Sequence, residues 1–198
     1  MRPCPIRKGQ RQVCGTSAVG RWSSAWGCRV KGAVTVSRSL VGAMRSPMRI
    51  VIAQMRVERE LAKNRETICS LLQRAQPEDW VVFPEGALTG YFPDETDYLV
   101  ATEREDVDAA LAGLRALVER RRCRCLVGTA RFVAGGWRNS AALISPAGEV
   151  RWYDKHTLGS LDSRHFAAGD ELSVYAVDGV NAGVQICWSC CFPGSGRS

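Results

Sequence analysis

Three residues of this chain have side chains that could carry out chemistry, and each stands where an apolar stretch ends. They are Glu85, Lys155 and Cys187, in that order along 198 residues. A carboxylate can accept a proton, an ammonium group can stabilise an oxygen that becomes negatively charged, and a thiolate can attack a carbonyl carbon. Together these three groups supply what acyl transfer through a covalent intermediate requires.

Taken singly, each of these residues also has a purely structural interpretation. Glu85 could be a solvated loop acid, and Lys155 an exposed lysine at the end of a strand. Cys187 could be an inert core thiol, because a free thiol has a pKa of about 8.5 and needs a base or a cation nearby to become an efficient nucleophile. The conjunction favours chemistry, since ligand sites gather at the ends of strands in α/β sheets.

The hydrophobic pattern predicts the elements that must hold these residues. Strands are predicted at Arg49–Met55, Trp80–Phe83, Cys125–Val133, Trp137–Ile144, Val150–Lys155, Leu172–Val177 and Ala182–Cys187. Amphipathic helices are predicted from about Leu61 to Gln76 and around Val107 to Val118. The early alternation of strand and helix indicates βαβ units, and the later strand pairs indicate antiparallel additions. We therefore expect an α/β fold with a mixed sheet covered by helices.

Charge divides the chain into two parts. The net charge is +7, but residues 1–46 hold nine Lys or Arg and no acid, so residues 47–198 carry a net charge of −2. We interpret residues 1–46 as a basic, disordered extension, with a targeting segment or a polyanion-binding tail as alternatives. Residues 47–198 form the expected domain, whose charge gives no reason to expect a nucleic-acid partner.

The cysteine content and the hydropathy indicate where in the cell the protein is expected. Nine cysteines is an odd count in a long chain, and no signal peptide with an apolar core is visible, so reduced thiols and a cytoplasmic location are expected. No run approaches the roughly 18 apolar residues that a membrane helix needs. We therefore expect no membrane association.

The order of the three residues and the sequences around them resemble the carbon–nitrogen hydrolase, or nitrilase, superfamily. The resemblance extends from about Met48 to Trp188. It rests on RIVIAQM, FPEGALTGY around Glu85, WYDKHTLG around Lys155, FAAGDEL, and GVQICW around Cys187. It implies a nitrilase-like α-β-β-α sandwich with mixed sheets.

The resemblance also implies a catalytic role for each matched position. Glu85 corresponds to the general base, Cys187 to the nucleophile, and Lys155 to the group that stabilises the tetrahedral intermediate. The backbone N–H of Trp188 corresponds to a second oxyanion donor. Ammonia or an amine leaves, and water hydrolyses the thioester. No metal or organic cofactor is implied; the expected partners are a small amide or N-carbamoyl substrate and, as a further option, other copies of the chain in a homo-oligomer.

Two departures from the family pattern affect these expectations. Many members carry a second glutamate seven residues before the glycine matching Gly169, and Asp162 stands there instead. The shorter acid predicts either a looser contact with Lys155 or a shifted loop. After Cys187 only the family's Phe192–Pro193 pair is present, so the domain is expected to be incomplete at its C-terminal end.

Two other functions stay open on the sequence alone. One is a zinc or redox module, because Cys187 and Cys190 have C-x-x-C spacing and Cys123 and Cys125 add two more thiols. No second C-x-x-C accompanies them. The other is an inactive hydrolase remnant that acts at most as a binding module.

Overall fold

The computed structural model describes residues 32–37, 48–172, 174–177 and 180–191. Its strands are β1 (Gly32–Ser37), β2 (Ile50–Ile52), β3 (Trp80–Val82), β4 (Arg124–Val133), β5 (Gly136–Ile144), β6 (Val150–Asp154), β7 (Val174–Val177) and β8 (Val180–Ile186). Its helices are α1 (Leu61–Leu72) and α2 (Arg104–Arg121), with the 3₁₀ turns η1 (Asp162–Arg164) and η2 (Cys187–Cys191).

The larger sheet contains five strands in the order β2-β3-β4-β5-β6. Strands β2, β3 and β4 are parallel, and β5 and β6 continue the sheet antiparallel. The parallel half is connected through the two helices, and the antiparallel half through short turns. This is the mixed sheet that the sequence predicted, and it follows from the switch between long and short connections.

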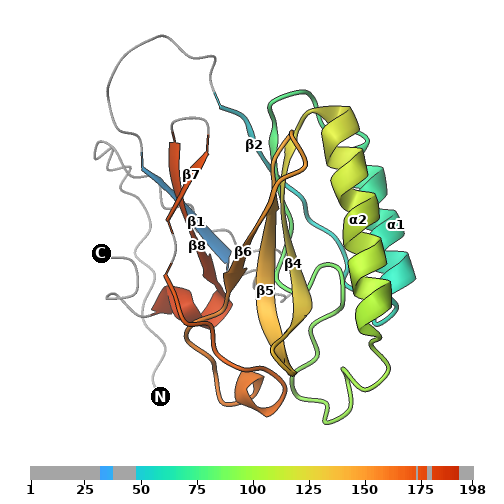
Figure 1. Cartoon of the computed structure of the whole chain (residues 1–198), viewed down its shortest axis with the longest axis vertical. Helices are drawn as coiled ribbons and strands as arrows, with labels where there is room; N and C mark the ends of the chain where they lie inside the picture. The colour runs from blue at the N-terminus through green and yellow to red at the C-terminus, as the bar shows by residue number, and fades with distance from the viewer. Residues whose placement is uncertain (1–31, 38–47, 173, 178–179, 192–198) are drawn as a thin grey trace, which may run out of the picture.

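Both helices pack on one face of this sheet, as Figure 1 shows. Helix α2 buries one stripe, made by Val107, Ala110, Leu114, Leu117 and Val118, at the spacing of a helix face. Its first turn is acidic and its last turn basic, which complements the helix dipole. The stripe joins a core with alternate residues of β4, so the helices are held against the sheet that carries the site.

A second sheet covers the opposite face of the larger one (Figure 1). It contains three antiparallel strands in the order β1-β8-β7. Leu126, Leu143 and Tyr153 of the larger sheet pack with Tyr175 and Val184 of the smaller one. The described residues thus form three layers of the expected α-β-β-α sandwich: helices, mixed sheet and second sheet.

The predicted elements agree with the structure except at their ends and in one place. Helix α1 stops at Leu72, short of the predicted Gln76, and β2 is confined to Ile50–Ile52. Strand β1 lies inside the segment interpreted as a disordered extension, where the sequence indicated no strand, and it pairs with β8 from Gly32 to Ser37. The proposed extension otherwise falls on residues 1–31 and 38–46, outside the described residues, where its disorder stays a prediction.

In the part of the chain that the structure describes, neither helix combines the length and apolar character needed to cross a membrane.

Candidate active site

Glu85 lies in a tight turn just beyond the end of β3. Phe83 N–H donates to the carbonyl of Leu126 at 2.8 Å, which extends the β3–β4 pairing to the start of the turn. Gly86 has φ +61°, a conformation that favours glycine. Gly128 of β4 lies directly beneath: a Cβ there would come within 2.8 Å of Glu85 Cα. Two glycines therefore let the turn close onto β4 and fix the direction of Glu85.

Lys155 follows β6 and is held by backbone bonds on both sides. Its N–H donates to the Asn139 carbonyl at 2.8 Å, and its carbonyl accepts from Gly169 N–H at 2.9 Å. A Cβ on Gly169 would lie 2.9 Å from Asp154 Cβ, so only glycine permits this close approach. The Lys155 side chain is fully shielded from solvent, which is rare for a lysine unless it is paired.

Cys187 stands where β8 ends and the 3₁₀ turn η2 begins. Its φ is +46°, a left-handed backbone conformation that costs a non-glycine residue energy. Such strain is often found where a nucleophile is turned away from its strand. The thiol is half-buried and packs beside the core between the two sheets.

The side chains of Glu85 and Lys155 belong to one hydrogen-bonded network. Lys155 Nζ donates to Glu85 Oε1 at 2.9 Å and to Asp162 Oδ2 at 2.7 Å. Asn139 Nδ2 donates to the same Glu85 Oε1 at 2.8 Å. Cys187 lies close enough for the Glu85 carboxylate to raise the pKa of its thiol. Glu85 is thus fixed through one oxygen by two donors, and its charge acts on the thiol.

Asp162 belongs to the same network despite its short side chain. Besides Lys155, its carboxylate accepts from the Tyr91 hydroxyl at 2.6 Å and from Gly159 N–H at 3.1 Å. It lies at the start of η1 and is buried. The loosened contact considered from the sequence does not occur, because the turn brings the backbone close enough for aspartate to reach Lys155.

The electrostatics of the site favour a charged Lys155 and a protonated Cys187 at neutral pH. Burial lowers the pKa of Lys155, but the carboxylates of Glu85 and Asp162 more than offset it, so that pKa is raised. Burial alone would raise the pKa of Asp162, yet hydrogen bonds from Lys155 and Tyr91 bring it below its usual value. Burial and the Glu85 carboxylate raise the pKa of Cys187 to about 11, against the lowering effect of Lys155. The thiol therefore requires a base before it can act as a nucleophile.

Two members of this network were not anticipated from the sequence. Asn139 is a buried amide in the middle of β5, and Tyr91 closes the FPEGALTGY stretch. An asparagine inside a predicted strand was the available signal for the first. Trp188, the other residue expected to support the site, follows Cys187 in η2 with an exposed side chain; the role of its N–H stays a prediction.

The cysteines whose side chains are described show no arrangement of a metal centre. Within the described ranges, no group of three or more His, Cys, Asp or Glu side chains is arranged to hold a metal ion. Cys123 and Cys125 are buried, with pKa values raised by burial, as inert core thiols are.

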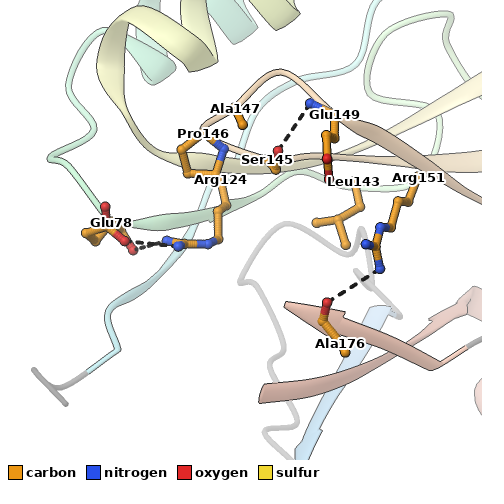
Figure 2. Close-up of a pocket in the computed structure, with 9 residues that line it drawn as sticks. All are labelled: Glu78, Arg124, Leu143, Ser145, Pro146, Ala147, Glu149, Arg151 and Ala176. Atoms are coloured by element: carbon orange, nitrogen blue, oxygen red, sulfur yellow. Dashed lines mark hydrogen bonds and ion pairs between the residues drawn. The ribbon is translucent and has the colours of Figure 1, made fainter. Parts of the chain in front are cut away.

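A separate pocket of about 390 Å³ lies at the end of the larger sheet opposite to Glu85, before β3 and at the start of β4 (Figure 2). Figure 2 shows its two arginines already engaged: Arg124 with Glu78 at 2.9 Å, and Arg151 with the Ala176 carbonyl at 3.4 Å. None of the three candidate catalytic residues lines it. We assign the chemistry to the Glu85 end of the sheet.

Comparison with known proteins finds solved structures that share this fold. The solved structures that resemble the chain include an amidase from Nesterenkonia sp., with 24% identity over 66% of this chain and 51% of that chain and a TM-score of 0.57. A cysteine-to-alanine mutant of the Nesterenkonia sp. AN1 amidase in complex with butyramide has 25% identity over 67% and 52%, with a TM-score of 0.58.

A glutamine-dependent NAD⁺ synthetase from Acinetobacter baumannii has 24% identity over 66% of this chain and 26% of that chain, with a TM-score of 0.57. The chain thus spans about half the length of the amidases it resembles. A search of curated protein sequences gave no match. The carbon–nitrogen hydrolase family model matches residues 49–197. Because that match covers most of the sequence, the chain belongs to the carbon–nitrogen hydrolase family.

Proposed function

We propose that the protein hydrolyses a non-peptide carbon–nitrogen bond, in a small amide or N-carbamoyl compound, through a thioester on Cys187. The observation that carries this proposal is the carboxylate of Glu85, whose Oε1 accepts from Lys155 Nζ at 2.9 Å. The same carboxylate raises the pKa of the Cys187 thiol, which places it near that thiol. A base, a nucleophile and a cation thus meet at the ends of three strands. Acyl transfer needs this combination within hydrogen-bond reach.

The first half-reaction uses all three groups. Glu85 accepts the proton of the Cys187 thiol as the sulfur attacks the carbonyl carbon. Lys155 Nζ, with the Trp188 N–H as a second donor, stabilises the negative oxygen of the tetrahedral intermediate. The intermediate collapses, the protonated Glu85 gives its proton to the leaving nitrogen, and ammonia or an amine departs.

The second half-reaction returns the enzyme to its starting state. Glu85 accepts a proton from water, which attacks the thioester carbon, and a second tetrahedral intermediate forms on the same oxyanion donors. Its collapse releases the carboxylic acid, and the proton returns to the Cys187 sulfur. Asn139 and Asp162 serve as positioning residues, because they hold Glu85 and Lys155 rather than touching the reacting atoms.

Small aliphatic amides are the first substrates to test. A Nesterenkonia sp. AN1 amidase mutant was solved with butyramide, and another with the acetamide moiety of fluoroacetamide added at its active-site cysteine. These relatives support a primary amide over a nitrile. The reduced thiol that the mechanism needs also fits the cytoplasmic location expected from the cysteine content.

Ammonia release from acetamide, butyramide and an N-carbamoyl amino acid tests the proposal. The wild-type chain should release ammonia from at least one of these compounds. Cys187→Ala should abolish the release, whereas Cys69→Ala, which changes a half-buried thiol on α1, should not. Equal turnover by wild type and Cys187→Ala would exclude covalent catalysis through Cys187. Absence of turnover from a folded wild-type chain would reject the proposed hydrolysis of these compounds.

A further inference from the structure

We propose that Cys187 and Cys190 form an intramolecular disulfide when the protein meets a hydroperoxide, and that this reversible modification shields Cys187 from irreversible oxidation. The modification itself does not depend on hydrolysis. Only its consequence, a reversible loss of turnover, rests on the proposed function.

The backbone places the two cysteines one turn apart. Both belong to η2 (Cys187–Cys191), a 3₁₀ turn. A 3₁₀ turn rises by about 2.0 Å per residue, which places the Cα atoms of residues i and i+3 roughly 6 Å apart. A disulfide accepts Cα–Cα separations of about 4.4–6.8 Å. The backbone spacing of this half-buried turn is therefore compatible with a disulfide between the two residues.

Among the other cysteines whose side chains the structure describes, no comparable pair is found. Cys123 and Cys125 are buried, and as alternate residues at the start of β4 they point to opposite faces. Cys69 lies on α1. Cys187 and Cys190, by contrast, are both half-buried, so a small peroxide and the second thiol can reach the first.

Cys187 is the thiol that reacts first, because the Glu85 carboxylate lies near enough to act on its thiol and can take its proton. Glu85 accepts that proton, and the sulfur attacks one oxygen of the peroxide. The O–O bond breaks, the other oxygen leaves with a proton as water, and Cys187 becomes a sulfenic acid. The sulfur is oxidised and the peroxide is reduced.

Cys190 completes the reaction. Its thiol sulfur attacks the sulfenic sulfur of Cys187, the S–O bond breaks, and hydroxide leaves with the thiol proton as a second water. Two thiols and one peroxide thus give one disulfide and two waters. Lys155 keeps its bonds to Glu85 and Asp162, so reduction by a thiol restores the original network.

Mass spectrometry of the full chain tests this proposal without any substrate. The protein is treated with hydrogen peroxide, its free thiols are blocked with iodoacetamide, and it is digested with chymotrypsin, which can cut after Trp188 between the two cysteines. The expected product is a pair of peptides joined through Cys187 and Cys190, which separate on reduction with dithiothreitol. Cys190→Ser should lack the joined pair and accumulate sulfinic or sulfonic acid on Cys187.

Cys191→Ser is the matched control, because it removes the adjacent thiol and should leave the Cys187–Cys190 link intact. Cys190→Ala repeats the test should the serine variant fold poorly, as judged by circular dichroism. A link from Cys187 to Cys191, or equal sulfinic acid in wild type and both Cys190 variants, would overturn the proposal. Since no step involves an amide, a chain without amidase activity could still form the disulfide, which keeps this result separate from the proposed function.

Discussion

Lys155 Nζ donates to Glu85 Oε1 at 2.9 Å, although the two residues stand 70 positions apart in the chain. The same nitrogen donates to Asp162 Oδ2 at 2.7 Å. One buried cation thus lies between two carboxylates and joins the turn after β3 to the segment after β6. This contact fixes the side chain of the proposed base and places a buried positive charge beside it.

Replacing Lys155 should cost considerable stability. Lys155→Met removes the cation while leaving Glu85 and Asp162 largely shielded from solvent, with side chains 14% and 3% exposed. Removing one member of a buried ion pair typically lowers the free energy of unfolding by about 3–5 kcal/mol. Urea unfolding followed by circular dichroism measures the change.

The matched control is Lys63→Met, which removes an exposed lysine paired with Glu60 on α1. This variant should unfold at the same urea concentration as wild type, because solvent screens such a pair. Equal midpoints for the Lys155 and Lys63 variants would mean that the buried network contributes nothing to the fold.

Gly128→Ala should displace Glu85. The added Cβ would lie 2.7 Å from Gly86 N and 2.8 Å from Glu85 Cα, and neither backbone atom can move without shifting the turn. Overpacking of this kind costs about 1–3 kcal/mol. We expect a lower unfolding midpoint together with slower release of ammonia from the amide that wild type hydrolyses. Gly113→Ala, on α2 with open space around it, should instead stabilise the protein by about 1 kcal/mol. Turnover at the wild-type rate in Gly128→Ala would show that the turn is not what positions the base.

Asp162 should contribute to the dependence of stability on acid. Its pKa is lowered in the folded protein, chiefly by Lys155 and Tyr91 acting against burial. The contribution of Asp162 to the free energy of unfolding is therefore complete above the pKa of the unfolded state, about 3.9. It is lost as the pH falls through the lower pKa of the folded state. Asp162→Asn should be less stable than wild type at neutral pH, with a difference that narrows below about pH 4. Parallel stability curves for the two proteins down to acid pH would contradict this.

The fold was largely predictable because its signals are local and repeated. Each strand of the larger sheet, and each helix that packs on it, has its own period of apolar residues. The observed ends of these elements differ from the predicted ends by only a few residues. Strand β1 was missed because Gly32–Ser37 lies in a stretch without sustained alternation, and its pairing with β8 is a long-range contact. Such pairing depends on the partner strand rather than on the segment itself.

The candidate site was predictable only in part. Glu85, Lys155 and Cys187 could be found because each closes a recognisable apolar strand. Asn139 could not, because its importance arises from where β5 places it, next to Glu85 Oε1, and not from its neighbours in sequence. Side-chain length alone likewise could not show whether Asp162 contacts Lys155. The position of the residue in the η1 turn also decides the distance between the two side chains.

The reactivity of Cys187 should increase with pH over an unusual range. Burial and Glu85 raise its pKa to about 11, so little thiolate exists at neutral pH in the absence of substrate. Because the thiolate is the form that alkylates, iodoacetamide labelling of Cys187 should accelerate as the pH rises toward that value. Peptide mass spectrometry over a pH series measures the rate. A rate that is already at its plateau at neutral pH would show that the resting thiol is ionised.

The most direct test of the central claim is fluoroacetamide labelling of wild type and Glu85→Gln, with the labelled cysteine identified by peptide mass spectrometry. A carbon–fluorine bond reacts poorly with an ordinary thiol, so labelling requires activation of the sulfur. We predict that the acetamide moiety adds to Cys187 in wild type with loss of fluoride and that Cys69 stays unlabelled. Glu85→Gln should lower the labelling rate about a hundredfold or more, because a positioned base contributes roughly 10²–10⁴-fold. Labelling of Cys187 at the same rate in both proteins, or labelling of Cys69 in preference to Cys187, would contradict the assignment of Glu85 as the base and Cys187 as the nucleophile.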